Sequence, residues 1–197
     1  MDITEEWLQK YREFLLQFIE ISEEEFDALK GILHPVHLSK GEFFEGTPRE
    51  SIRSGFIIKG LLRTYFITEG GDEFITDFCR ENQITSNYDL LTSDLSHEYF
   101  SEAMEETIIL AMEYERFLQL SVQYPIFATL KNTLIEQYFI EKINRENDLM
   151  SLNASQKYIR FLNTHKEIVN RVPQYHIASY IGITPVALSR IKKDLEK

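Results

Sequence analysis

The chain has 197 residues, a formal net charge of −11 and a sequence pI of about 5.0. Its content of 43% hydrophobic and 27% charged residues is that of a soluble globular protein. No uncharged stretch approaches the roughly 18 apolar residues of a membrane span, and the acidic first residues differ from the basic start of a signal peptide, so we expect a cytoplasmic protein.

The first part of the chain predicts two helices. Apolar residues recur at helical spacing from residue 7 to 19, which indicates an amphipathic helix. Ser22 and Glu25 form a capping box for a second helix, from residue 23 to about 33, that ends before Pro35. We expect both helices to pack on the domain that follows.

The residues that could bind a metal or react as nucleophiles are few. His34 and His37 flank Pro35 in an expected turn, and no other histidines have close ligand spacing, so we predict no metal site. Cys79 is the only cysteine, which leaves no partner for an internal disulfide. We interpret it as a buried strand residue, with a sensor thiol as the alternative.

From about residue 37 to 113 the pattern changes to short strands. Six of the eight glycines lie between residues 41 and 71, and the segments between them are rich in β-branched and aromatic residues. Gly70 and Gly71 suit a hairpin turn. This spacing favours a small barrel or double-sheet roll. The expected strands are residues 56–58, 62–67, 74–78 and 107–112.

A polar segment from about residue 82 to 99 interrupts this pattern. We predict a short helix and a loop here, and an insertion of this kind in a small barrel is often where a ligand binds. The candidate ligand-binding residues, chosen by their position in the roll, are Arg63, Tyr65, Phe74, Asn87, Tyr88, His97 and Tyr99.

Helix returns at about residues 113–121 and again at 125–152. The longer helix carries two apolar stripes, and two stripes need two surfaces. One stripe would cover the roll, and the other would meet the same helix of a second subunit. The alternative is that a single chain buries both.

The segment from residue 174 to 193 fits a helix-turn-helix. Ala178 provides the small side chain that a crossing helix needs, and Gly182 suits a turn with positive φ. Thr184 would cap the second helix and Pro185 would occupy its first turn. The alternative is an ordinary helical hairpin. The residues expected to face the shared core are Ile177, Ile181, Ile183, Leu188 and Ile191.

The outward side of the second helix would enter a major groove. Between residues 155 and 197 the chain has eight Lys or Arg against three Asp or Glu, so the local charge is positive although the whole chain is acidic. We expect phosphate contacts from Tyr175, Thr184, Lys192 and Lys193; the alternative is that these residues are only solvated helix surface. The predicted DNA-binding set is Tyr175, Thr184, Pro185, Val186, Ser189, Arg190, Lys192 and Lys193.

The order of these parts resembles the Crp/Fnr family of bacterial transcription regulators over nearly the whole chain. The resemblance rests on Gly41-Glu42, Gly46, Phe56-Ile57, Gly60 and Gly71 in the roll, then a long helix, then Arg171-Val172-Pro173 and the helix-turn-helix. It implies an α+β fold: a cyclic-nucleotide-binding-like β-roll with flanking helices (residues 1–124), a dimerisation helix and hinge (125–152) and a winged-helix domain (153–197). It also implies a homodimer that reads a palindromic operator, with RNA polymerase as a further partner.

The nucleotide-binding residues of the family are replaced here. Members that bind cyclic AMP carry a Gly-Glu pair for the ribose and an Arg-Ser pair for the cyclic phosphate. Ser86-Asn87 stands at the first position and His97-Glu98 near the second, and no arginine lies between residues 81 and 115. A buried phosphate without a guanidinium is poorly compensated, and Glu98 and Glu102 would repel it. We therefore predict that cyclic AMP is not the ligand and that the effector is an unknown small molecule or protein partner.

Other family features also differ. One cysteine excludes the four-cysteine iron–sulfur cluster of the family's oxygen sensors, whereas haem ligation by Cys79 or His97 stays open; no cofactor is predicted. Arg190 matches the family's guanine-reading arginine, but Val186 stands at its acidic position, so the operator should differ from that of the cyclic AMP receptor. The chain stops at Lys197, and we therefore expect a truncated wing.

Three functions are compatible with these patterns. The leading hypothesis is a dimeric DNA-binding transcription regulator. The second is a ligand-binding or protein-interaction module that has lost sequence-specific DNA binding, as Val186 and the acidic bulk would permit. The third is a cupin-like enzyme, which would need a metal triad or an acid/base pair that the spacing does not provide, so we predict no enzymatic activity.

Overall fold

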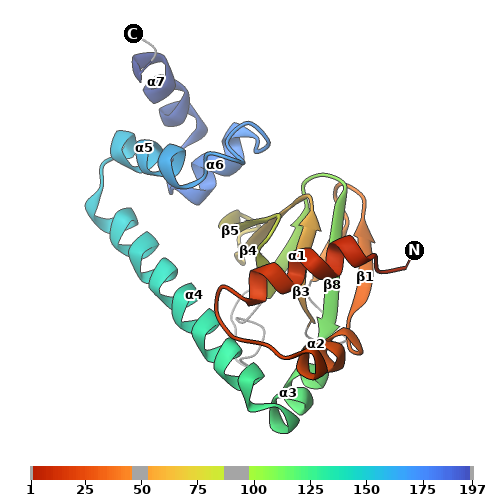
Figure 1. Ribbon diagram of the computed structural model, residues 1–197. Coiled ribbons are helices and arrows are strands. Elements are labelled where there is room, and N and C mark those ends of the chain that lie inside the picture. Colours follow the sequence, from red (N-terminus) through yellow and green to blue (C-terminus); the bar gives the residue numbers. More distant parts are fainter. Residues whose placement is uncertain (1, 46–52, 87–97, 196–197) are drawn as a thin grey trace.

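A computed structural model describes residues 2–45, 53–86 and 98–195 (Figure 1). Within these residues, strands form two four-stranded antiparallel sheets, with the orders β1-β8-β3-β6 and β2-β7-β4-β5. The expected α+β double-sheet roll is thereby confirmed. The strands are β1 (His34–Leu38), β2 (Phe43–Glu45), β3 (Arg53–Lys59), β4 (Leu61–Ile67), β5 (Glu73–Arg80), β6 (Ile84–Ser86), β7 (Glu98–Ala103) and β8 (Thr107–Glu113).

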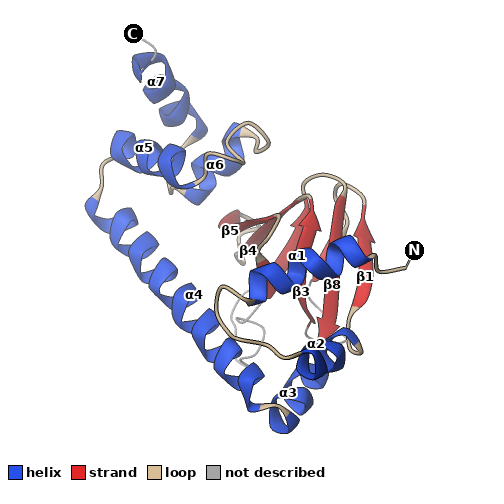
Figure 2. Cartoon of the chain, viewed as in Figure 1, coloured by secondary structure: helices blue, strands red, loops and turns tan. Residues whose placement is uncertain are grey.

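Two of the helices precede the strands of the roll in the sequence, and the others follow them (Figure 2). They are α1 (Glu5–Leu15), α2 (Glu23–Lys30), α3 (Tyr114–Gln123), α4 (Pro125–Ser151), α5 (Ala154–Thr164), α6 (Gln174–Tyr180) and α7 (Pro185–Leu195). None of the helices in the described ranges is long and apolar enough to cross a membrane.

The expected turn around Pro35 is wrong. Residues 34–38 form β1, whose partner is β8. β1 lies at the edge of its sheet, where the missing N–H of a proline breaks no ladder hydrogen bond. The polar segment 82–99 also contains more strand than expected, because β6 and the start of β7 lie in it. Gly46, Asn87, Tyr88 and His97 lie outside the described residues.

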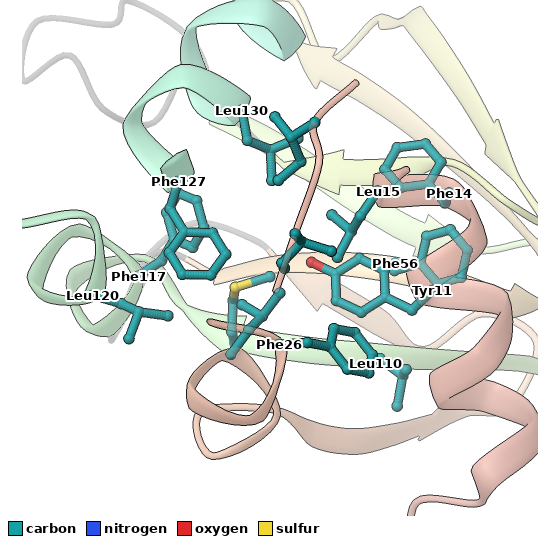
Figure 3. Close-up of a cluster of buried hydrophobic side chains, with 14 of the residues drawn as sticks. Tyr11, Phe14, Leu15, Phe26, Phe56, Leu110, Phe117, Leu120, Phe127 and Leu130 are labelled. Atoms are coloured by element: carbon teal, nitrogen blue, oxygen red, sulfur yellow. The ribbon is translucent and has the colours of Figure 1, made fainter. Parts of the chain in front are cut away.

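The two N-terminal helices have the expected caps. Thr4 Oγ1 accepts the N–H of Trp7 at 3.3 Å, and Ser22 and Glu25 form the predicted capping box. The apolar faces of both helices join β3, β8, α3 and the start of α4 in one core, of which Figure 3 shows the centre. Tyr11, Phe56 and Phe127 are fully buried there, and the rings of Tyr11 and Phe56 lie 4.9 Å apart.

Helix α4 starts in this core. Leu130 of one predicted stripe is buried against the core, beside Phe127. The second stripe is exposed beyond Ile135, which is half-buried: Phe139, Ile143 and Met150 are exposed, and Met150 presents 72% of its surface. A single chain therefore does not bury both stripes.

The last three helices share a second core with the outer face of the roll. Leu61, Tyr65, Ile75 and Phe78 from β4 and β5 are buried together with apolar residues of α5, α6 and α7. Figure 1 shows these helices beside the β4–β5 end of the roll, reached by α4. The helical segment is therefore docked on the roll, and what it leaves exposed determines what it can bind.

Candidate nucleic-acid interface

The helix-turn-helix geometry follows from a few small or capping residues. Ala178 is completely buried where α6 meets its neighbours, and Gly182 has a φ of +67°. The N–H of Ile183 donates to the carbonyl of Ala178 at 2.9 Å, which closes the turn. Thr184 Oγ1 accepts the N–H of Ala187 at 3.2 Å, so the predicted cap of α7 is present.

The outward side of α7 is open to solvent. Val186 exposes 62% of its surface, and Ser189, Arg190 and Lys193 are also exposed, while Lys192 is half-buried. In the described ranges, no side-chain hydrogen bond or ion pair engages Arg190. Its guanidinium is therefore available to an external acceptor. The remaining predicted DNA contacts, Tyr175, Thr184 and Pro185, are also exposed.

The helical segment formed by α5, α6 and α7 is docked, on the side opposite the exposed face of α7, on the free edge of β5. An edge strand leaves backbone groups unpaired, and here three side chains bind them. Ser179 Oγ accepts the N–H of Ile75 at 3.1 Å. Arg145 Nη2 donates to the Ile75 carbonyl at 3.1 Å, and Lys142 Nζ donates to the Thr76 carbonyl at 3.0 Å. The edge of the roll is thus covered by α4 and α6.

Arg171 makes a second contact between the helical segment and the roll. Its Nη1 and Nη2 donate to the two carboxylate oxygens of Glu81 at 3.0 and 2.9 Å, and Nη2 also donates to Glu105 at 2.6 Å. These contacts raise the pKa of Arg171 and contribute to a lowered pKa for Glu81, whose burial alone would raise it. We call Arg171, Glu81 and Glu105 the arginine clamp.

The predicted ligand residue Arg63 belongs to this docking surface. It is 8% exposed, its Nη2 lies 2.7 Å from Glu102 Oε2, and its Nη1 lies 2.7 Å from Glu73 Oε2. Its Nη1 also lies 3.3 Å from Nδ1 of His176 on α6. Burial, and next the charge of Arg63, lower the pKa of His176 to about 4, so its imidazole is neutral.

The other described ligand candidates also lie on this outer sheet. Tyr65 donates to Glu102 Oε2 at 3.1 Å, and burial raises its pKa to about 12. Phe74 and Tyr99 pack against the two sides of Phe66. The structure thus brings Arg63 and Tyr65 together, and neither lines the roll cavity.

That cavity, of about 220 Å³, lies between the roll and α4. Thr64, Thr76 and Cys79 line it, and Thr64 lies between the candidates Arg63 and Tyr65 on β4 but points to the opposite face. Burial raises the pKa of the Cys79 thiol, so the thiolate is disfavoured. No group of three or more potential metal ligands occurs among the described residues.

The charges around this cavity are acidic. Asp77 and Glu141 are lining residues, and no Lys or Arg is among the described ones. Lys142 pairs with Asp77 at 2.9 Å, so Glu141 is the carboxylate that a ligand phosphate would meet without a compensating cation.

The chain is similar in sequence to known regulatory proteins, although no protein-family model matches it. It is 25% identical to the anaerobic regulatory protein of Pasteurella multocida, over 90% of the chain and 68% of that protein. It is 26% identical to the fumarate and nitrate reduction regulatory protein of Vibrio cholerae, over 90% of the chain and 75% of that protein.

Solved structures show the same fold. A Crp/Fnr-family transcriptional regulator from Eubacterium rectale matches with a TM-score of 0.71 and 15% identity, over 89% of this chain and 84% of its own. A CooA variant from Carboxydothermus hydrogenoformans matches with a TM-score of 0.66 and 17% identity, over 92% and 82%. The chain therefore has the fold of Crp/Fnr-family regulators, and over nine tenths of its length it is similar in sequence to proteins named as regulatory proteins.

Proposed function

We propose that this regulator reads an inverted-repeat operator with the exposed side of α7. The observation that carries the proposal is the combination of a formed helix-turn-helix with an outward face on which Arg190 has no partner in the described chain. An unpaired guanidinium at this position suits the O6 and N7 atoms of guanine. Val186 offers a methyl contact to thymine, and we assign the phosphate contacts to the solvent-facing residues Tyr175, Thr184, Lys192 and Lys193.

The second apolar stripe of α4 supports a homodimer. Phe139, Ile143 and Met150 are exposed, and the spacing of seven residues between Ile143 and Met150 is the repeat of a two-helix seam. Pairing α4 with its copy would bury this stripe and give a two-fold axis. In this arrangement residues 1–124 form the sensor, 125–152 the dimerisation helix and hinge, and 153–197 the DNA-binding unit.

The cavity between the roll and α4 supports an effector other than cyclic AMP. Its described lining has Glu141, an Asp77 that is already paired with Lys142, and no Lys or Arg of its own, whereas cyclic AMP would need a donor for its phosphate. A neutral or cationic small molecule fits this chemistry better. Such a ligand would act by changing the position of α4. This would change the distance between the two copies of α7 in the dimer, which must match operator half-sites about 34 Å apart.

Selection of bound sequences from a random duplex library tests the proposed function. Purified full-length protein at moderate salt should recover an inverted repeat with half-sites one helical turn apart. Recovery of only sequence-independent DNA, with affinity that falls steeply as salt is added, would contradict it. That result would favour a ligand-binding module without operator recognition.

A further inference from the structure

A larger cavity, of about 340 Å³, lies where the three parts of the molecule meet. Its walls come from β5, the second half of α4, and helices α5 and α6, which can be followed in Figure 1. It adjoins the smaller cavity between the roll and the middle of α4, and the two share Asp77, Phe78, Gln83 and Glu141. The volume is at the lower end of the range of small-molecule sites.

The lining of this cavity is basic. Five Lys or Arg and three Asp or Glu contribute to it. Lys142 is paired with Asp77 at 2.9 Å, and Arg160 with Asp148 at 3.0 Å. Those pairs neutralise two of the three carboxylates and leave Glu141 as the third.

Two of the cations have no carboxylate partner in the described chain. Lys157 is half-buried at the cavity and makes no ion pair there. Arg145 donates through Nη2 to the carbonyls of Ile75 and Tyr180, and its buried Nε has no hydrogen-bond partner among the described residues. A buried guanidinium nitrogen without an acceptor is costly, and an anion in the cavity would satisfy it.

One wall of the cavity is aromatic. The rings of Phe161 and His165 are stacked with centroids 4.6 Å apart, and Tyr180 lies 5.3 Å from Phe78 and 5.7 Å from Phe161. Ring faces of this kind pack against a planar ligand. The Arg145 guanidinium lies 4.6 Å from the centre of the Tyr180 ring, so the site combines cations that have no carboxylate partner with an aromatic wall.

Dimerisation through the apolar stripe would leave this cavity open. Each residue turns a helix by about 100°, so Ile143 and Arg145 lie on nearly opposite sides of α4. Glu141, Arg145 and Asp148 share the cavity side, whereas Ile143 and Met150 share the other. The copy of α4 in a dimer would therefore approach the face that does not line the cavity.

We infer that this cavity binds a small organic anion that carries an aromatic ring and a phosphate or carboxylate group. The anion would contact Arg145 and Lys157, and its ring would lie against Phe161 and Tyr180. Because the walls come from the roll, α4 and the helical segment, a bound ligand stabilises their docked arrangement. The consequence for DNA binding rests on the proposed function, but ligand binding itself does not.

Titration calorimetry on the full-length protein tests this site without DNA. The probes are phenyl phosphate, phenylacetate and inorganic phosphate. We expect at least one aromatic anion to bind the wild-type protein with a submillimolar Kd and to bind more tightly than inorganic phosphate. Absence of binding by both aromatic anions overturns the inference. Equal affinity for inorganic phosphate overturns the role of the aromatic wall.

Charge-removing variants locate the site. Arg145→Gln and Lys157→Gln should each weaken binding about tenfold or more, since each removes a charge-assisted contact. Arg145 also holds α4 against β5, so Lys157→Gln, which removes no side-chain hydrogen bond or ion pair within the described chain, is the decisive variant. Arg116→Gln, an exposed arginine on α3, is the matched control and should bind like wild type. Unchanged binding by Lys157→Gln overturns the inference.

The two proposals can fail separately. Binding of the aromatic anion with no operator recovered from the duplex library would overturn the proposed function and leave the site in place. Recovery of an operator with no anion binding would do the reverse.

Discussion

Three arginines show how surroundings decide the role of one residue type. Arg63 is buried between Glu73 and Glu102, and Arg171 is held by Glu81 and Glu105. Arg190 is exposed and has no such partner in the described chain. A guanidinium keeps its charge in all three settings, so only the partners differ. Arg63 and Arg171 therefore contribute to the contact between the roll and the helical segment, whereas Arg190 is available to a base edge.

Replacing Arg190 tests this assignment. Arg190→Ala should cost about 1–3 kcal/mol of discrimination between the selected operator and a scrambled duplex, because it removes a bidentate contact with guanine. Dimerisation and the unfolding midpoint should not change, since the side chain contacts no other described residue. Competition binding of both duplexes at one salt concentration measures the ratio. The assignment fails if Arg190→Ala retains the wild-type ratio while Arg116→Ala, the control, does the same.

At the scale of elements, the apolar pattern of α4 predicts that two of its faces need to be covered. Its two stripes are visible in the sequence, and the structure covers one and leaves the other exposed. Ile143→Asp should therefore weaken the dimer about a hundredfold or more, since two copies of the side chain lose about 1.5 kcal/mol each or more. Sedimentation at several protein concentrations measures the shift towards monomer.

A matched control is available for this variant. Ile159 on α5 is as exposed as Ile143, each at 41% of its surface, but lies outside the stripe. Ile159→Asp should remain dimeric. If both variants or neither dissociated, α4 pairing through this stripe would be wrong.

β4 shows where the sequence is less informative. Its residues Leu61, Leu62, Tyr65 and Phe66 are apolar in both phases of the strand, so no alternation marks the inner face. The physical reason is that both faces are covered, one by the roll interior and one by the helical segment. The sequence therefore does not show which of the neighbours Arg63 and Thr64 faces the roll cavity; Thr64 is the one that lines it.

Other elements differ in how far the sequence could predict them. The helix-turn-helix depends on local signals such as Gly182 and Thr184, and it was predicted residue by residue. β2 and β6 have three residues each, too few to show a period, and they form because neighbouring strands pair with them. Tertiary pairing, not local propensity, decides such short strands.

At the scale of the whole molecule, the docked helical segment depends on contacts between distant parts of the chain. Arg171 and Glu81 are 90 residues apart, and Ile75 and Ser179 are 104 apart. No local pattern connects such residues, so the sequence predicted the two units but not their shared core. The docking contacts include groups that titrate, which makes the arrangement dependent on pH.

His176 determines the direction of this dependence. In the docked state its pKa is about 4, because it is buried and next to the charged Arg63, while Glu73 opposes the shift. Released from the roll, it would return towards its ordinary value of about 6.5. Undocking therefore takes up a proton, so the docked state is fully stable above about pH 6.5 and loses stability as the pH falls towards 4. Burial also lowers the pKa of His165, which acts in the same direction.

The amide of Ile75 reports this equilibrium, since it donates to Ser179 Oγ across the docking surface. Its hydrogen-exchange protection, corrected for the intrinsic rate, should fall between pH 7 and pH 5, and His176→Gln should reduce this fall, leaving the part due to His165.

Arg171→Ala should lower protection at every pH in this range, because the clamp pairs a permanent cation with Glu81, whose pKa is lowered. Protection that is constant with pH in the wild-type protein would mean that His176 does not control docking, whereas a loss caused only by Arg171→Ala would assign the docked state to the arginine clamp.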